Sequence, residues 1–374
     1  MVRLYLQPLT LVPSPQAVGG DAVRLAGGMA FAHLFAVTVT RDGAVVQREL
    51  ATAAGIAEAF TRLPDALGPE AEAQWAGLTT AHPPLQLGSR MVRLDQPQVL
   101  GIVNVTPDSF SDGGKFLDDP AEAQAQAAAM HEAGAALIDV GGESTRPGAA
   151  PVWEGDEIKR VVPAIEHAVA IGAAVSVDTR RAAVMEAALA AGAHLINDVS
   201  ALRHDPRSRE VALRSGVPVV LMHAPGPVDA STEDLHAGGE YGNVVHDVFD
   251  WMRAARDRAL EARIERGRII LDPGIGFGKT MADNLALLNA LPLFHALGQP
   301  LLLGASRKRM IGALSNEAPA HRRLGGSVAL AVKGMDAGVQ LLRVHDVHDT
   351  VQARNVWRGL RDAALTDFSA LGED

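Results

Sequence analysis

The chain has 374 residues, of which 48% are hydrophobic, and its formal net charge is −10. Positively and negatively charged residues are both scattered along its length. This length fits a barrel of about 250 residues with an extension, and the acidic balance argues against a broad nucleic-acid surface. Because there is no cysteine, disulfides, thiolate metal sites and cysteine nucleophiles are excluded. No run approaches the roughly 18 apolar residues of a membrane helix, and the N-terminus lacks a signal-peptide core, so we expect a cytoplasmic protein that does not bind membranes.

Residues 1–84 differ in pattern from the rest of the chain, and we predict a small α+β extension there. Residues 31–40 alternate loosely between apolar and polar side chains, and Arg41-Asp42-Gly43 is typical of a hairpin turn. Helical spacing follows near 53–63 and 69–78. The polar residues of this segment do not cluster, so its role stays unassigned.

A regular alternation begins after the proline-containing junction His82-Pro83-Pro84. Residues 85–92 predict a short hairpin, and strand-like runs then alternate with stretches of helical apolar spacing. The predicted strands lie near 99–105, 136–140, 174–178, 194–198, 217–222, 268–272, 300–304 and 340–344. The predicted helices include 121–131, 180–190, 244–264 and 347–363. Because eight is the strand number of a TIM barrel, we predict an α/β fold with a (β/α)8 barrel over residues 85–374.

Polar residues follow the carboxyl ends of all eight predicted strands. In chain order they are Asn104, Asp139 with Glu143, Asp178, Asn197-Asp198, His223, Asp272, Ser306-Arg307-Lys308 and Arg343-Val344-His345-Asp346. Since parallel barrel strands end at one face, these side chains would build a single site. One polar strand end is usually structural, but eight in succession predict a functional site.

The glycine-rich stretch from Asp272 to Thr280 leaves a second interpretation open. It ends in Gly278-Lys279-Thr280, like a phosphate-binding loop of the form G-x-x-x-x-G-K-[ST]. The first glycine of that motif is replaced by Pro273, which weakens the interpretation without excluding it. The stretch is equally typical of an ordinary βα loop in which Asp272 faces a ligand.

Taken together and in this order, the motifs resemble dihydropteroate synthase, a family of pterin-binding barrels. The segments that carry the resemblance are 104–114, 143–148, the Asp272 loop, 306–308 and 343–347, and the match covers the chain from about residue 85 onward. The family joins 4-aminobenzoate to a dihydropterin that bears a CH2-pyrophosphate group, and pyrophosphate leaves. The resemblance implies these small-molecule substrates, a Mg2+ cofactor and a homodimer.

The resemblance also implies roles for individual side chains. The implied pterin-binding residues are Thr145, Asp178, Asn197, Asp272 and Lys308, since a carboxylate can accept two parallel hydrogen bonds from the pterin amino group and ring N–H. Pyrophosphate would be bound by Asn104, Arg343 and His345, and Asn104 would also hold the metal. The implied 4-aminobenzoate-binding residues are Phe110, Arg146, Pro147, Phe277 and Ser306. The implied catalytic residues are Asp178, Lys308 and Asp112.

Two other functions remain open. A related methyltransferase barrel binds methyltetrahydrofolate and shares the carboxylate and asparagine recognition of a pterin, but it has no need for the 306–308 and 343–345 clusters. A non-catalytic pterin-binding protein would be expected to have lost some strand-end polar residues. The stretch Met222-His223-Ala224-Pro225-Gly226 departs from the methionine and glutamine usual in the family, so the pocket rim there is expected to differ.

Overall fold

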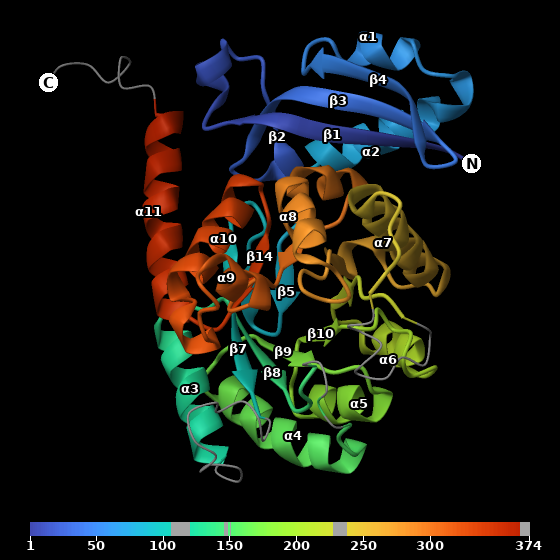
Figure 1. The fold of residues 1–374 in the computed structure, drawn as a ribbon. Coiled ribbons are helices and arrows are strands. Elements are labelled where there is room, and N and C mark those ends of the chain that lie inside the picture. Colours follow the sequence, from blue (N-terminus) through green and yellow to red (C-terminus); the bar gives the residue numbers. More distant parts are fainter. Residues whose placement is uncertain (106–119, 146–148, 150, 227–237, 367–374) are drawn as a thin grey trace, which may run out of the picture.

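The computed structural model describes residues 1–105, 120–145, 149, 151–226 and 238–366. It shows a barrel with an N-terminal extension seated at one end (Figure 1). The barrel sheet has eight parallel strands in the order β12-β11-β10-β9-β8-β7-β14-β13, and a bridge between Leu271 and Leu301 joins its two ends. The predicted TIM barrel is therefore confirmed. Within the described residues, every helix is too short or too polar to cross a membrane.

The observed elements follow the predicted ones closely. The barrel strands are β7 (Gln98–Asn104), β8 (Leu137–Gly141), β9 (Val175–Asp178), β10 (Leu195–Asp198), β11 (Val219–Met222), β12 (Ile269–Asp272), β13 (Leu302–Leu303) and β14 (Leu341–Val344). The helices are α3 (Pro120–Glu132), α4 (Glu154–Ala170), α5 (Ala182–Ala190), α6 (Ser208–Ser215), α7 (Val244–Glu261), α8 (Met281–Asn289), the 3-10 helix η6 (Leu291–Leu297), α9 (Arg309–Leu314), α10 (Leu324–Asp336) and α11 (Val347–Leu365). The main difference is β13, which is shorter than predicted.

The barrel interior is layered because every second residue of a strand points inward. The first layer is apolar and packs against the hairpin of β5 (Leu85–Leu87) and β6 (Arg90–Val92). Its members are Leu100, Leu137, Ala174, Leu195, Val220, Ile270, Leu302 and Leu341. Two residues further along each run stand Ile102, Asp139, Ser176, Asn197, Met222, Asp272, Gly304 and Arg343. The alternation thus leads from an apolar plug to a polar layer at the carboxyl ends of the strands.

The extension is an antiparallel sheet with helices, as the sequence predicted. Its elements are β1 (Val2–Val12), β2 (Val23–Arg24), β3 (Phe31–Arg41), β4 (Ala44–Thr52), α1 (Ile56–Thr61) and α2 (Gly68–Thr79). Asp42 and Gly43 have positive φ, as the two central residues of a type I′ hairpin turn require. The sequence did not predict β1, because Pro8 interrupts its alternation; the strand tolerates Pro8 next to a shift in its register against β3.

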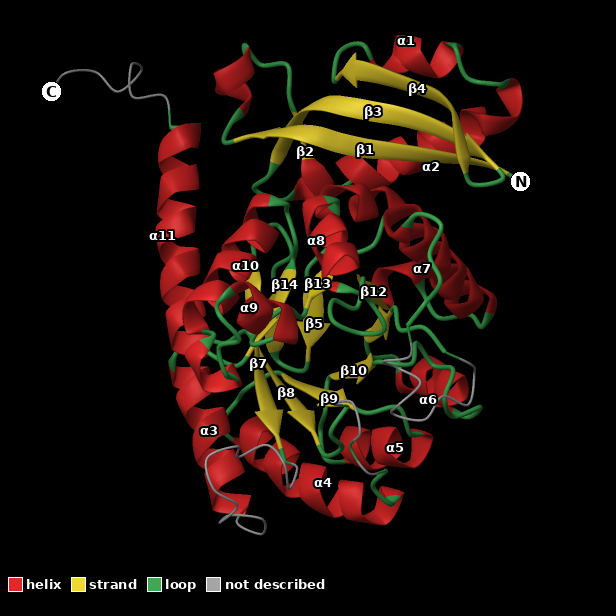
Figure 2. Cartoon of the chain, in the orientation of Figure 1, coloured by secondary structure: helices red, strands yellow, loops and turns green. Residues whose placement is uncertain are grey.

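The extension packs on the end of the barrel that lies opposite the carboxyl ends of the strands. Figure 2 shows β7 and β8 pointing away from it. The Tyr5 ring stacks on His246 of α7 at 3.8 Å, and the Tyr5 hydroxyl donates to Asp250 at 3.0 Å. On α2, Gly77 approaches the Ala296 backbone so closely that a Cβ would lie 2.6 Å from its carbonyl oxygen. The apolar core is continuous across this contact, so the boundary at residue 84 remains a prediction.

A chain that begins at Leu85 tests the role of the extension. Its absence would uncover η6, where Leu293 and Phe294 are fully buried, and each such side chain is worth about 1.5–3 kcal/mol. We expect a lower melting temperature and more aggregation, with the activity per folded molecule unchanged. Thermal melts and activity normalised to the folded fraction measure both effects. A folded but inactive chain would show that the extension acts on the site.

Candidate active site

Arg343, at the carboxyl end of the barrel, holds two carboxylates together. Its Nε donates to Asp139 and its Nη2 to Asp178, each at 2.6 Å. Asn197 donates from Nδ2 to the same Asp139 oxygen at 3.1 Å. Burial disfavours the charge of Arg343, but the two carboxylates outweigh this effect and raise its pKa. Residues of β8 and β9 therefore meet at the guanidinium that β14 carries, and β10 joins them through Asp139.

Asp178 and Asp272 are carboxyl groups whose charge burial disfavours. Burial raises the pKa of Asp178 to about 7, although the positive charge of Arg343 opposes the rise. Burial raises the pKa of Asp272 to about 6, although Asp272 accepts a hydrogen bond of 2.7 Å from the Gly274 amide. Such perturbed groups gather at functional sites.

Lys308 is the second cation of the site. Its Nζ lies 4.1 Å from the centre of the Phe277 ring, a cation–π contact. Burial and then the charge of Arg343 lower the pKa of Lys308 to about 8, while Asp272 and Asp178 oppose the shift. Lys308 therefore remains mostly protonated at neutral pH, beside the carboxylate predicted to bind the pterin.

Ser306 and His345 form a pair at the ends of the seventh and eighth strands. The Ser306 hydroxyl lies 3.0 Å from His345 Nδ1 and accepts from the His345 amide at 3.2 Å. When the Ser306 hydroxyl donates to Nδ1, the neutral ring carries its own proton on Nε2, which is then available as a donor. Burial, followed by the charges of Arg343 and Arg307, lowers the pKa of His345 to about 3, so the ring is neutral.

The turn that presents Ser306 and Lys308 is held by Arg307 and Asp346, two strand-end residues to which the sequence assigned no ligand. Arg307 adopts φ 56, a conformation that non-glycine residues rarely adopt. Its guanidinium pairs with Asp346, and its amide donates to the Ser327 hydroxyl at 2.9 Å. Arg307 therefore supports the turn rather than facing the site.

Lys279 decides between the two interpretations of the glycine-rich loop. Its Nζ donates to the carbonyl oxygens of Gly274 at 2.8 Å, Phe277 at 3.0 Å and His223 at 3.3 Å. In a phosphate-binding loop this lysine must reach the phosphates. Here all three hydrogen bonds of the ammonium group go to backbone carbonyl oxygens of the loop and of His223. The structure therefore supports the interpretation as an ordinary βα loop. The sequence did not assign this role to Lys279.

An apolar wall adjoins the polar groups. Phe277 packs with Val199, Met222 and Ala224, all of them buried. Ala224 is one of the residues that depart from the family pattern, and it is fully buried in this wall. The departure therefore lies behind the Phe277 ring, in the packing that positions this wall.

The remaining predicted residues are only partly described. Thr145 lies two residues after Glu143 and is half-buried. Phe110, Asp112, Arg146 and Pro147 lie outside the described residues, so their predicted roles are not tested.

Asn104 was predicted to hold a magnesium ion, and its surroundings fit that role. Within the described residues its side-chain amide has no hydrogen-bond partner, and a Cβ placed on the adjacent Gly141 would lie 3.6 Å from its Oδ1. Mg2+ commonly binds one or two protein oxygens and completes its shell with water and substrate phosphates. In the same part of the chain, no group of three or more His, Asp or Glu side chains could hold a metal alone. A single amide oxygen thus suits an ion carried mainly by a phosphate-bearing substrate.

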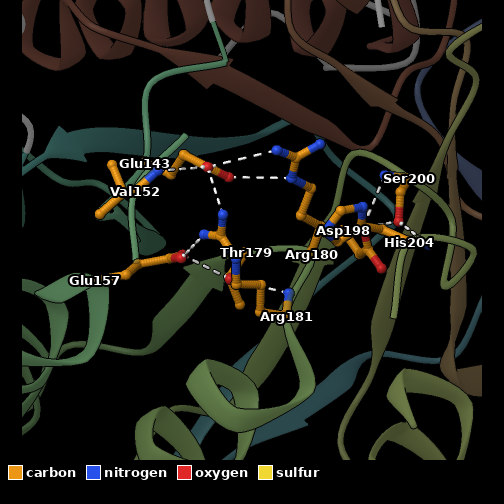
Figure 3. A network of polar contacts seen from close by, with 9 residues as sticks. All are labelled: Glu143, Val152, Glu157, Thr179, Arg180, Arg181, Asp198, Ser200 and His204. Atoms are coloured by element: carbon orange, nitrogen blue, oxygen red, sulfur yellow. Dashed lines mark hydrogen bonds and ion pairs between the residues drawn. The ribbon is translucent and has the colours of Figure 1, made fainter. Parts of the chain in front are cut away.

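A buried ion network beside these residues was not predicted as a unit (Figure 3). Glu143 accepts from Arg180 Nε at 3.1 Å and from Arg181 Nη2 at 2.8 Å. Glu157 on α4 pairs with Arg181 and accepts from the Thr179 hydroxyl at 2.7 Å. Burial alone would raise the pKa of Glu143, but Arg180 and Arg181 outweigh it and lower the pKa. The network connects the turns that follow β8 and β9.

Comparisons of the sequence and of the structure with known proteins point to the same kind of binding site. A family model described as "Pterin binding enzyme" matches residues 100–345. The dihydropteroate synthase of Bacillus subtilis is 44% identical over 250 residues, which are 67% of this chain and 83% of that protein. A structure of the Xanthomonas albilineans dihydropteroate synthase with 4-aminobenzoic acid is 45% identical, with a TM-score of 0.69 over 75% of this chain and 99% of that one. A Yersinia pestis dihydropteroate synthase with a sulfonamide drug complex is 43% identical, with the same TM-score and coverage. The chain therefore belongs to the dihydropteroate synthase family of pterin-binding enzymes.

Proposed function

We propose that this chain condenses 6-hydroxymethyl-7,8-dihydropterin pyrophosphate with 4-aminobenzoate, giving 7,8-dihydropteroate and pyrophosphate. The observation that carries the proposal is the cluster of Asp178, Asp272, Lys308 and Arg343, whose charges interact at the strand ends. It contains carboxylates for the pterin and cations for an anionic leaving group. The family membership and the 4-aminobenzoic acid bound to the Xanthomonas albilineans relative support the same reaction.

The pterin is bound by Asp272, Asn197 and Lys308 in this proposal. The Asp272 carboxylate accepts from the pterin amino group and ring N–H, and its burial strengthens both hydrogen bonds. Asn197 can donate and accept, which suits the mixed edge of the ring. Lys308 donates to the carbonyl side. Thr145 stands near the ring by resemblance to the family.

The pyrophosphate is bound by Arg343 and by the neutral Nε2 donor of His345. Arginine offers a planar fork of donors that matches phosphate oxygens. Asn104 would hold Mg2+, which would neutralise charge on the leaving pyrophosphate. Asp112 belongs to the proposed catalytic set by resemblance alone.

In the reaction the methylene C–O bond breaks with its electron pair leaving on pyrophosphate, and the amine nitrogen forms the new C–N bond and then loses a proton. Positive charge develops on the pterin methylene as the C–O bond breaks, and the Asp178 carboxylate stabilises it. Phe277 supplies an aromatic wall for 4-aminobenzoate, and Ser306, Phe110, Arg146 and Pro147 complete its proposed slot. The Ser306 hydroxyl is already engaged with His345, so its amide is the group left for the substrate carboxylate.

A pterin-binding methyltransferase is the second candidate, and the site disfavours it. Methyl transfer releases no pyrophosphate and needs neither Arg343 nor His345 at the strand ends. We test the proposal by incubating the purified protein with both substrates and Mg2+ and measuring 7,8-dihydropteroate by chromatography. Product formation that a chelator abolishes and added Mg2+ restores supports the reaction and the metal. The absence of product would refute the proposed function.

Sulfonamides should inhibit the enzyme in competition with 4-aminobenzoate. They mimic that substrate, a Yersinia pestis relative is known with a sulfonamide drug complex, and no residue is inserted between Lys308 and Met310 to narrow the slot. Excluding such a mimic would need only about 1–3 kcal/mol of steric cost. Steady-state kinetics at varied 4-aminobenzoate measure the competition. Inhibition that added 4-aminobenzoate cannot relieve would place the slot elsewhere.

A cytoplasmic homodimer through the last helices is also part of the proposal. Val356 and Leu360 on α11 are 63% and 68% exposed, and Leu324 at the start of α10 is 38% exposed. Val356 and Leu360 are four residues apart and therefore share one face of α11, and exposed apolar side chains on one face are typical of a contact between proteins. Light scattering of the eluted protein measures the mass, and a monomer would refute the dimer.

A further inference from the structure

Glu143 lies where two turns of the site meet. It follows β8 by two residues, and its carboxylate accepts hydrogen bonds from Arg180, Arg181 and the amide of Val152 at 3.3 Å. Val152 stands just before α4, so Glu143 ties the start of the 143–152 segment to its end. Arg180 and Arg181 belong to the turn that follows Asp178. One carboxylate thus holds both turns (Figure 3).

The turn after Asp178 is held from a second side as well. Arg181 bridges Glu143 and Glu157, and Glu157 also accepts from the Thr179 hydroxyl. The Thr179 hydroxyl in turn accepts from the Arg181 amide at 3.3 Å. The three residues that follow Asp178 are therefore all fixed by these two glutamates. Asp178 itself contacts Arg343.

Stability alone explains this network poorly. The side chains of Glu143 and Arg180 are 5% and 3% exposed, and Glu157 is fully buried. Taking such charges out of water costs so much that apolar residues of similar volume often stabilise a protein as well or better. Buried ions fix a geometry, because each charge has only one arrangement that satisfies it. Here that geometry is the spacing between the two turns.

We propose that Glu143 is a positioning residue for the condensation. It fixes the turn after Asp178 relative to the two ends of the 143–152 segment. This inference rests on the proposed function, because the segment carries Thr145, assigned to the pterin, and Asp178 faces the reacting methylene. Asp272, Asn197 and Lys308 come from other strands, so Glu143 contributes little to the ground-state affinity for the dihydropterin. The position of Asp178 against the reacting methylene does depend on Glu143, so we expect the main effect on kcat.

The test is Glu143→Gln, which keeps the shape and removes the charge. We expect kcat to fall roughly tenfold, while the Kd of the dihydropterin pyrophosphate changes little. Hydrogen exchange of the Val152 amide should accelerate and exchange in the barrel strands should not. Arg181→Lys, which keeps the charge but cannot bridge two carboxylates, should act in the same direction. The double variant should be little worse than Glu143→Gln, because both residues act through one network.

Glu49→Gln is the matched control, because it removes a Glu–Arg pair, with Arg62, at the far end of the molecule. It should leave both parameters unchanged. Unaltered kinetics in Glu143→Gln would overturn the inference. Equally weaker binding of both substrates, together with faster hydrogen exchange throughout the barrel, would overturn it as well. An inactive wild-type enzyme would instead refute the proposed function, so the two failures are distinguishable.

Discussion

Asp272→Asn should cripple binding of the dihydropterin. The amide keeps the shape of the carboxylate but loses its charge and replaces one acceptor oxygen with a donor, which faces a donor on the pterin. Loss of a charge-assisted hydrogen bond costs about 1.5–3 kcal/mol, or roughly ten- to hundredfold in affinity, and the mismatched donor adds to it. Calorimetric titration with the dihydropterin pyrophosphate measures this loss.

The same residue gives a pH dependence with a definite sign. Burial raises the pKa of Asp272 to about 6. The proton must leave before the carboxylate can accept two hydrogen bonds, so wild-type affinity should fall as the pH drops below about 6, and this part of the dependence should vanish in Asp272→Asn. Asp283→Asn, in the exposed cap of α8, is the control and should bind normally. Unchanged affinity in Asp272→Asn would remove Asp272 from the site.

Arg343→Met should have the second large effect. The substitution leaves Asp139 and Asp178 without their shared cation and removes a proposed donor to pyrophosphate. Breaking a buried pair by removing one partner costs about 3–5 kcal/mol, less where solvent reaches the pair, as it does at Arg343, which is 20% exposed. We expect kcat/KM to fall by at least roughly a hundredfold, together with a lower melting temperature.

Arg343→Lys separates charge from geometry. Lysine keeps the positive charge but lacks the planar fork with which the guanidinium donates to both carboxylates. Compared with Arg343→Met, it should therefore recover more of the stability than of the activity. Arg358→Met, which removes a surface arginine paired with Asp362, should change neither. Near wild-type activity in Arg343→Met would show that the strand-end cluster does not bind pyrophosphate.

The predictable part of the site follows from strand geometry. Residues that end buried parallel strands must meet at one face, so the sequence alone is enough to group Asp178, Asn197, Asp272 and Arg343. The order of helical and strand-like patterns determined the barrel in the same way. Both inferences depend only on local periodicity, which the sequence displays directly.

The partners of these residues could not be predicted, because they come from elements far apart in the chain. Asp139 and Arg343 are separated by 204 positions, and only the closed barrel brings them together. The sequence could show Asp139 at a strand end but not which cation it would meet. Lys279 matches a phosphate-binding motif, yet its side chain donates to carbonyl oxygens of its own loop and of His223. β1 was missed because Pro8 conceals its alternation.

The most direct test of this account is pyrophosphate release from 6-hydroxymethyl-7,8-dihydropterin pyrophosphate, measured with and without 4-aminobenzoate. We predict that 4-aminobenzoate strongly stimulates the release and that each pyrophosphate is matched by one 7,8-dihydropteroate. A protein that binds the dihydropterin but releases no pyrophosphate in the presence of both 4-aminobenzoate and Mg2+ would contradict the account, and methyl transfer from methyltetrahydrofolate would establish the alternative.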